Sequence, residues 1–236
     1  MRYLGLHGFT GAPSSLDALA LPEGSVTPAL GGHLTTEARG SFDDEVARVA
    51  ALGAGCTAIV GYSLGGRLAL GALARYPERY ERAVIISAQP GLTSDSERAA
   101  RRVADRRFVD LLLERGLEAF VDAWQALPLW ASQGQLPAAV KSEQRAQRLR
   151  HTAAGLAASL IQHGLGEMPD LRADLRQVRT RVEILVGERD PKFVALGREL
   201  SELLPSARLT IAPGAGHNLL LERPALCREL LSVYTG

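Results

Sequence analysis

The sequence predicts an α/β protein in which a mostly parallel sheet is flanked by helices and carries an inserted helical cap. Three observations lead to this prediction. Short apolar runs recur along the chain, helical periodicity fills several of the intervals between them, and one interval is far too long for a single crossover helix. A chain of 236 residues, 46% of them hydrophobic, can bury one large core and still carry a substantial insertion.

Six short apolar segments, bounded by glycine, proline or charged residues, are predicted to be buried strands. They are Tyr3 to Leu6, Val26 to Ala29, Thr57 to Val60, Ala83 to Ile86, Val182 to Val186 and Arg208 to Ile211. Helical periodicity marks the segments Phe42 to Leu52, Leu64 to Tyr76, Val194 to Leu204 and Ala225 to Tyr234. Strands that alternate with helices indicate a parallel sheet covered on both faces.

The regular alternation stops after Ile86, and the next predicted strand does not begin until Val182. Because one crossover helix needs far fewer residues, we expect 89–170 to form a helical cap, while 1–88 and 171–236 form the core. Ligands of open α/β sheets bind at the carboxyl ends of the strands, so the cap is expected to supply substrate contacts. Helical segments within it are predicted around Ser96 to Gly116, Leu117 to Trp124, Pro137 to Leu149 and Gly155 to Gly164.

Composition narrows the classes of protein to which the chain could belong. Lys and Arg number 27 against 26 Asp and Glu, so no overall field draws the chain to nucleic acid or to an anionic membrane. Cys56 and Cys227 lie outside any CxxC pattern, and the five histidines lack metal-binding spacing. No stretch has the apolar length of a membrane span or of a secretory signal. We expect a cytoplasmic enzyme without cofactor or metal, acting on a small molecule.

A serine lies at the junction of a predicted strand and a predicted helix. The segment Gly61-Tyr62-Ser63-Leu64-Gly65 follows the apolar run that ends at Val60. This setting is typical of a nucleophile elbow, a tight turn whose flanking residues must be small because side chains there would collide with neighbouring backbone. The five-residue pattern alone is a weak signal, and its strand-turn-helix context makes it much stronger.

A reactive serine needs a base and an orienting acid, and in this setting the acid and then the histidine follow the serine along the chain. Asp190 ends the loop after the strand that begins at Val182, and His217 follows the last predicted strand. The structural alternatives are that Asp190 only caps a helix and that His217 is a surface residue, and Glu188 is the lesser candidate for the acid. Order and placement favour a triad of Ser63, Asp190 and His217 on an α/β-hydrolase fold.

The first predicted strand ends in a glycine-rich turn, Leu6-His7-Gly8-Phe9-Thr10-Gly11. At this position the fold supplies one backbone donor of an oxyanion hole, so the amides of Phe9 and Leu64 are the expected donors. Each donor contributes roughly 3 kcal/mol by stabilising charge where it develops. His7 either holds the loop by hydrogen bonding or takes part directly, and the first interpretation is favoured.

Arg67 is predicted to lie in the first turn of the helix after Ser63, where the helix dipole already places partial positive charge. A cation is unfavourable there unless a nearby anion compensates its charge. A nearby Asp or Glu would make Arg67 a structural strut, whereas a substrate carboxylate would make it a clamp. The bidentate geometry of the guanidinium favours the clamp.

The predicted cap carries arginines and tryptophans for which a structural and a functional role both stay open. Arg98, Arg102 and Arg106 are spaced four apart and line one helical face. Nearby acidic residues favour a solvated face for most of them, although one or two could point into the cleft. Trp124 and Trp130 lie in a region able to roof an apolar pocket, and packing within the cap explains them at least as well.

Several segments resemble one family, the 2-succinyl-6-hydroxy-2,4-cyclohexadiene-1-carboxylate synthases, which eliminate pyruvate in menaquinone biosynthesis. The resemblance spans most of the chain. Its more selective parts are the serine turn continued by Gly66-Arg67, the turn Pro90-Gly91-Leu92, the cap arginines and Lys192-Phe193. Gln89 and Gln125 depart from the pattern, because some members carry histidine and tyrosine there.

The resemblance implies an elimination in which Ser63, activated by His217 and Asp190, removes a carbon-bound proton as a general base, and pyruvate leaves without an acyl-enzyme. The family's substrate carries several carboxylates. The arginines that match its anion-binding positions are Arg67, Arg106 and Arg150, and the other residues expected at the substrate are Trp124, Phe193 and His7.

Two other functions stay open. A carboxylester or carbon-carbon bond hydrolase would use the same triad with Ser63 as nucleophile, and the triad does not separate the two chemistries. The pocket separates them, because a neutral ester has no use for convergent arginines. A catalytically idle binding or scaffold protein is disfavoured by the complete triad and oxyanion loop.

Overall fold

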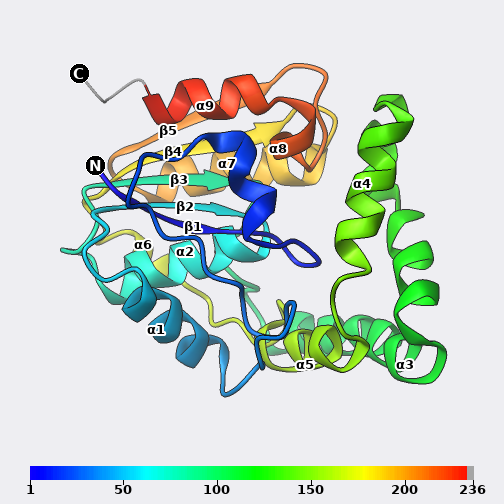
Figure 1. The fold of residues 1–236 in the computed structure, drawn as a ribbon. Coiled ribbons are helices and arrows are strands. Elements are labelled where there is room, and N and C mark those ends of the chain that lie inside the picture. Colours follow the sequence, from blue (N-terminus) through cyan, green and yellow to red (C-terminus); the bar gives the residue numbers. More distant parts are fainter. Residues whose placement is uncertain (233–236) are drawn as a thin grey trace.

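The computed structural model describes residues 1–232, and its centre is a five-stranded parallel sheet (Figure 1). In sheet order the strands are β1 (Tyr3–Leu6), β2 (Ala58–Tyr62), β3 (Arg82–Ile86), β4 (Arg181–Gly187) and β5 (Ala207–Ala212). Every residue of β1, β2 and β3 is buried, which explains why these strands are continuous apolar runs rather than alternating ones. The predicted α/β class is confirmed.

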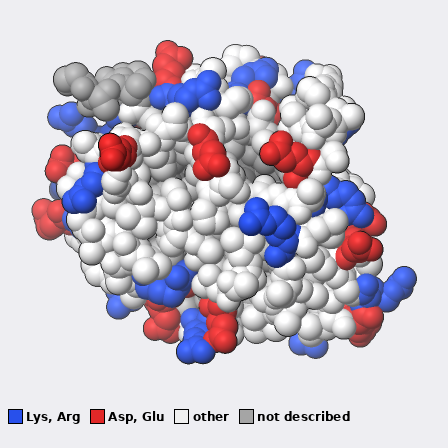
Figure 2. Space-filling view, viewed as in Figure 1, with Lys and Arg blue, Asp and Glu red and all other residues white. Residues whose placement is uncertain are grey.

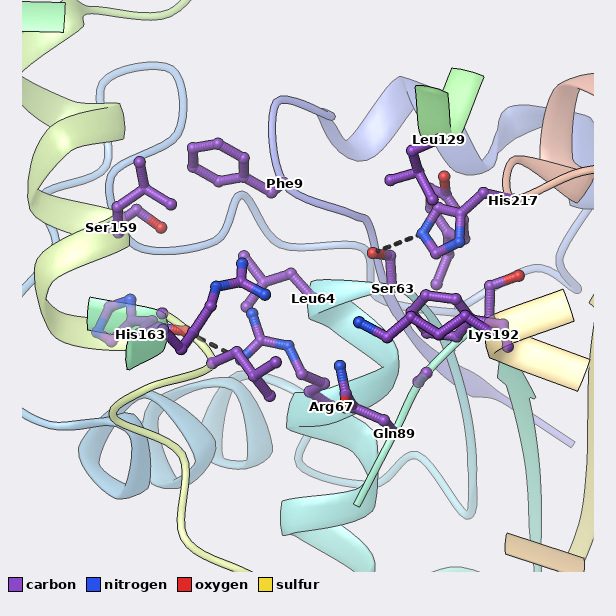
Figure 3. A pocket seen from close by; sticks show the side chains of 18 of the residues that line it. Phe9, Ser63, Leu64, Arg67, Gln89, Leu129, Ser159, His163, Lys192 and His217 are labelled. Carbon is purple, nitrogen blue, oxygen red and sulfur yellow. Dashed lines mark hydrogen bonds between the residues drawn. The ribbon is translucent and has the colours of Figure 1, made fainter. Parts of the chain in front are cut away.

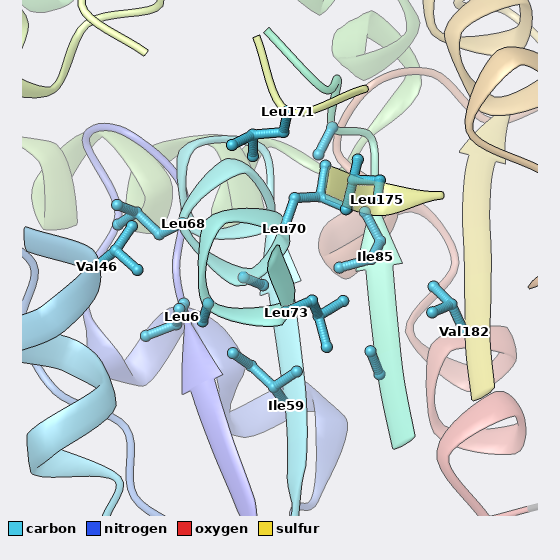
Figure 4. Close-up of a cluster of buried hydrophobic side chains, with 14 of the residues drawn as sticks. Leu6, Val46, Ile59, Leu68, Leu70, Leu73, Ile85, Leu171, Leu175 and Val182 are labelled. Carbon is cyan, nitrogen blue, oxygen red and sulfur yellow. The ribbon is translucent and has the colours of Figure 1, made fainter. Parts of the chain in front are cut away.

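Helices cover both faces of the sheet. One face carries α1 (Phe42–Leu52), α2 (Leu64–Arg75), α6 (Arg172–Leu175) and α7 (Pro191–Leu203), and the other carries the 3-10 helix η1 (Pro13–Leu19), α8 (Leu219–Glu222) and α9 (Pro224–Ser232). Leu68 and Leu73 of α2 are fully buried in one apolar cluster with Ile59 of β2 (Figure 4). Because each buried leucine contributes roughly 1.5–3 kcal/mol, α2 is held firmly, and with it the serine turn at its start.

The predicted strand Val26 to Ala29 is wrong, whereas the other five predicted strands are present. Val26 forms only an isolated bridge with Leu4, in which its amide donates to the Tyr3 carbonyl and its carbonyl accepts from the Gly5 amide, both at 2.8 Å. Pro28 has no N–H with which to continue the ladder, so the pairing stops.

The chain between β3 and β4 is helical. It forms α3 (Asp95–Gln125), the 3-10 helix η2 (Pro128–Gln135), α4 (Ala138–Arg148) and α5 (Ala153–His163), and α3, α4 and α5 lie beyond the strand ends to which the arrows point (Figure 1). α3 and α5 share their own cluster of buried side chains: Val109, Leu112, Phe120, Val121, Leu156, Ala157 and Leu160. The cap bounds at residues 89–170 stay a prediction.

Within the cap, α3 changes direction at Gly116, whose φ of 80° and ψ of 179° are not helical. The two predicted segments meet at this point. The 3-10 helix η2 has no counterpart in the predicted helices, because its eight residues show no helical periodicity. The end of the predicted helix Ala225 to Tyr234 falls outside the described residues. None of the helices in the described part of the chain has the length and apolarity to cross a membrane.

Candidate active site

Ser63 occupies the turn between β2 and α2 with a φ of 52° and a ψ of −109°, a conformation that residues other than glycine rarely adopt. A Cβ atom added at Gly61 would lie 2.3 Å from the Gly65 carbonyl oxygen, and one added at Gly65 would lie 2.1 Å from the Leu6 carbonyl oxygen. Close backbone approach therefore requires both glycines. The turn places Ser63 at the carboxyl edge of the sheet, as the elbow pattern predicts.

The structure brings Ser63, His217 and Asp190 together (Figure 3). His217 Nε2 lies 3.2 Å from Ser63 Oγ, and His217 Nδ1 lies 2.8 Å from Asp190 Oδ2. With Nδ1–H donated to the carboxylate, Nε2 is the acceptor for the serine proton. His217 and Asp190 are both buried, so this pair is shielded from water.

The loop that carries His217 is held by two carboxylates. Glu188 Oε2 accepts from the Gly214 amide at 2.8 Å, and Glu222 Oε2 accepts from the Gly216 amide at 2.7 Å. Glu188, the lesser candidate for the acid, therefore holds the loop instead of the imidazole. Phe193 packs against the His217 ring with centroids 4.5 Å apart, which further restricts its orientation.

Phe9 and Leu64, the expected oxyanion donors, both line the cavity beside Ser63. Neither amide has a hydrogen-bond partner among the described residues. For Leu64 this follows from its place at the first position of α2, because the first amides of a helix have no intrahelical acceptor. Both donors are thus available for negative charge that develops next to Ser63.

The cavity over Ser63 has a volume of about 170 Å³ and lies between the sheet and the cap. Trp124, Leu129 and Trp130 line it from the cap, while Ala88 and Phe193 line it from the core and Gln89 from the junction of the two. Figure 3 shows the side chains of Arg67, Gln89 and Lys192 converging on the space beside Ser63.

Buried polar atoms of the lining lack partners within residues 1–232. They belong to Tyr62, Ser87, Trp124, Trp130, Ser159 and His163. Burying a polar group without a hydrogen bond costs roughly 1–3 kcal/mol, so these groups lower the stability of the lining. No cluster of three or more His, Cys, Asp or Glu side chains in the described chain could hold a metal ion.

The comparisons with known proteins agree with this geometry. The model of the alpha/beta hydrolase family matches residues 4–230. A Bacillus subtilis (strain 168) protein provisionally named 2-succinyl-6-hydroxy-2,4-cyclohexadiene-1-carboxylate synthase is 36% identical over 97% of this chain and 88% of its own length. The chain belongs to this synthase family of α/β-hydrolases.

Two further relatives extend the comparison. The 2-succinyl-6-hydroxy-2,4-cyclohexadiene-1-carboxylate synthase of Escherichia coli (strain K12 / DH10B) is 37% identical over 71% of this chain, a match that spans 63% of that protein. The structure of MenH from S. aureus superimposes with a TM-score of 0.88 at 26% identity, covering 98% of this chain and 92% of that one.

Arg67 is the one arginine of the predicted anion-binding set that lines the cavity. Its Nη1 donates to the His163 carbonyl at 3.1 Å, and no carboxylate pairs with it among the described residues. It keeps some exposure through the cavity although protein surrounds it. Burial, with the neighbouring charge of Arg101, lowers the pKa of Arg67 to about 9, and Asp105 partly opposes the shift. A ligand carboxylate would restore the balance of charge here.

The structure does not bring Arg106, Arg150 or His7 to the cavity. Arg106 points to solvent and pairs with Asp110 at 2.7 Å, and Arg150 is exposed beyond the end of α4. His7 is fully buried, donates from Nδ1 to the Gly8 carbonyl at 2.9 Å and accepts from the Leu30 amide at Nε2. Its geometry is that of a residue holding the loop. Trp124 and Phe193, in contrast, do line the cavity.

Three cations near the site were not among the predicted substrate-binding residues. Arg101 and Lys192 line the main cavity, and Arg148, which is 4% exposed and lies over the Trp130 ring, lines an adjoining pocket. Lys192 had a usable signal, because it lies in the first turn of α7, where the helix dipole disfavours a cation as it does at Arg67. Arg101 had none, since only the orientation of α3 separates it from Arg102.

Proposed function

We propose that this chain is a lyase of menaquinone biosynthesis that eliminates pyruvate from a succinyl-enolpyruvyl-cyclohexene carboxylate, forming 2-succinyl-6-hydroxy-2,4-cyclohexadiene-1-carboxylate. The charge of the cavity lining is the observation that carries the proposal. Arg67, Arg101 and Lys192 line it, and none of its described lining residues is Asp or Glu. A substrate with several carboxylates suits such a lining, whereas a neutral ester would leave Arg67 and Lys192 without a carboxylate and Arg101 with Asp105 alone.

In this proposal Ser63 acts as a general base. His217 Nε2 accepts the Ser63 hydroxyl proton, and Asp190 stabilises the resulting imidazolium. Ser63 Oγ then takes the carbon-bound proton of the substrate while the carbon-oxygen bond to the enolpyruvyl group breaks. The proton on His217 goes to the departing enolpyruvate, which becomes pyruvate, and no bond forms to Ser63.

The oxyanion donors serve the same step. Removing a proton next to a carbonyl places negative charge on the carbonyl oxygen, and the unpartnered amides of Phe9 and Leu64 are available to that oxygen.

The surface supports a small-molecule substrate rather than a polyanionic partner. Figure 2 shows acidic and basic side chains interspersed over the visible face, without a basic stripe that would suit nucleic acid or an anionic membrane. With 27 basic and 26 acidic residues, the charge that acts on a ligand is concentrated locally in the cavity. We propose a cytoplasmic location for the enzyme, acting without cofactor.

Pyruvate release from the purified protein, supplied with the succinyl-enolpyruvyl-cyclohexene carboxylate, tests the proposal directly. A coupled lactate dehydrogenase assay follows pyruvate, an aryl ester runs in parallel, and Ser63→Ala corrects for spontaneous elimination. We expect pyruvate and the cyclohexadiene product in equal amounts, with no covalent adduct on Ser63 in the mass spectrum of quenched enzyme. Ester turnover through an acyl-enzyme without pyruvate release would establish the hydrolase instead, and turnover of neither substrate would favour the binding protein.

A further inference from the structure

The backbone of Thr10, the residue after the oxyanion donor Phe9, is hydrogen-bonded to two histidines that come from different parts of the chain. Its amide donates to His33 Nε2 at 3.2 Å, and its carbonyl accepts from His151 Nε2 at 3.1 Å. His33 lies in the loop between η1 and α1, whereas His151 lies between α4 and α5 in the cap. Thr10 is 4% exposed and has a φ of 63°, a strained conformation that persists only where its surroundings enforce it.

Both rings use both of their nitrogens. His33 donates from Nδ1 to the Gly31 carbonyl at 3.1 Å, so its Nε2 is the acceptor for Thr10. His151 Nδ1 accepts from the Leu34 amide at 2.9 Å, so its Nε2 carries the proton donated to Thr10. Each ring is therefore neutral and fixed in one tautomer, because an acceptor nitrogen cannot carry a proton. The two rings meet edge to face with centroids 5.3 Å apart.

His7 fixes the preceding peptide group, the one between Gly8 and Phe9. Its Nδ1 donates to the Gly8 carbonyl at 2.9 Å, and the Gly11 amide donates to the same oxygen at 3.0 Å. In a trans peptide the C=O and the following N–H point in opposite directions. Holding the Gly8 oxygen therefore aims the Phe9 N–H the opposite way, and that amide has no partner among the described residues.

The Phe9 side chain makes a second connection to the cap. Its ring meets Trp124 of α3 edge to face at 5.2 Å, and on another side it meets His33 at 5.6 Å. The oxyanion loop thus contacts the cap through the Phe9 ring and through the Thr10 carbonyl. Only the second contact is a directional hydrogen bond that fixes a backbone group.

We propose that His33 and His151 clamp Thr10 from the core and from the cap, so that the aim of the Phe9 amide depends on the cap segment that carries His151. Both histidines are positioning residues, since neither lines the cavity. The inference rests on the proposed function only in requiring that the Phe9 amide meets developing negative charge, which applies to elimination and to ester hydrolysis alike.

The pair His151→Leu and His151→Gln tests the clamp. Leucine keeps apolar volume and removes the donor to Thr10, whereas glutamine can place an amide N–H near the position of Nε2. We expect His151→Leu to lower kcat by about 10- to 100-fold with KM changed less than about threefold, because the loss falls on a transition-state contact. His151→Gln is expected to recover most of that kcat.

Leu204→Ala is the matched control, because Leu204 is buried at the end of α7, away from the cavity lining. Each variant is assayed at the same number of degrees below its own Tm, so that the two variants are compared at a similar folded fraction. A kcat loss in His151→Leu no larger than that in Leu204→Ala, or a change confined to KM, would overturn the clamp. The aryl ester provides kcat if the wild type releases no pyruvate, so failure of the lyase proposal and failure of the clamp are distinguishable.

Amide hydrogen exchange gives a readout that needs no turnover. If the two histidines act as one clamp, His151→Leu loosens the Thr10 amide bonded to His33, and its exchange should become at least about tenfold faster than in the wild type. The same variant should leave exchange in β3 unchanged. Thr10 exchange at the wild-type rate in a folded His151→Leu would show that the cap does not control this loop.

Discussion

Asp190 holds His217 with one carboxylate oxygen and caps α7 with the other. Oδ2 accepts from His217 Nδ1 at 2.8 Å, and Oδ1 accepts from the Phe193 amide at 3.3 Å. The sequence presented these roles as alternatives, and the structure shows both. The helix cap fixes the carboxylate, and the fixed carboxylate then orients the imidazole toward Ser63. Structural and catalytic demands thus converge on one side chain.

Asp190→Asn should separate the two roles. Asparagine can still accept from the Phe193 amide, so Tm should change little. Its NH₂ group facing His217 Nδ1 favours the tautomer with the proton on Nε2, which cannot accept from Ser63. We expect kcat to fall roughly 10³- to 10⁴-fold. Thermal unfolding and steady-state kinetics measure the two effects, and a large Tm loss with modest loss of kcat would mean that Asp190 is mainly a cap.

Ser63→Ala should abolish pyruvate release while the protein stays folded. Alanine fits the same turn, and within residues 1–232 the Ser63 hydroxyl is hydrogen-bonded to His217 Nε2 alone. Because Ser63 and His217 act as a unit, the double variant with His217→Ala should be no slower than the slower single variant. Additive losses in kcat would show that the two residues act independently.

The sequence predicted the sheet well because nearly all residues of β1, β2, β3 and β4 are buried, and such strands are short and mostly apolar segments. Val26 to Ala29 has a similar local composition, and the absence of a donor at Pro28 limits its pairing with β1 to an isolated bridge. The break at Gly116 was predictable from the glycine itself, whereas the 3-10 helix Pro128–Gln135 has no periodic signal.

The candidate site also has parts that the sequence predicted and parts that it did not. The triad and the oxyanion loop lie at ends of core strands, where the topology of the sheet brings them to the same edge. The cap cations depend on how α3 and α4 rotate against the core, and the family spacing pointed to Arg106 and Arg150 where the structure places Arg101 and Arg148. A rotation of about 100° per residue is enough to move a side chain from the cavity to solvent.

Stability should fall as the solution becomes acidic. Burial lowers the pKa of His7 to about 4 and also lowers the pKa of His33, His151 and His163. The unfolded chain binds protons on these residues near pH 6.5 and the folded chain does not, so stability is complete above pH 6.5 and is lost as the pH falls toward 4. Each histidine contributes up to about 1.4 kcal/mol per pH unit. Urea unfolding between pH 7 and pH 5 measures the slope.

The charged neighbours of these rings are mostly cations, which reinforces the trend. They are Arg48 beside His7, Arg150 beside His151, and Arg48 and Arg67 with the single carboxylate of Glu45 beside His163. His33→Gln removes one titrating group, so its slope against pH should be shallower than that of the wild type. An equal slope would place the acid sensitivity elsewhere.

Arg101 and Arg106 provide a matched pair for the anion-binding proposal, because they lie five positions apart on α3 and each pairs with an aspartate four residues later. Arg101 lines the cavity, whereas the Arg106 side chain is 65% exposed. Arg101→Ala should reduce kcat/KM for the carboxylate substrate roughly 30-fold, which corresponds to a loss of about 2 kcal/mol of transition-state stabilisation, because a charge-assisted contact is lost. Arg106→Ala loses only an exposed ion pair and should stay within about threefold of the wild type.

Turnover of a neutral aryl ester corrects both variants for general loss of folded enzyme. The opposite ranking would mean that the cap rotates on binding and presents Arg106 to the substrate, and equal losses on both substrates would make Arg101 a structural partner of Asp105.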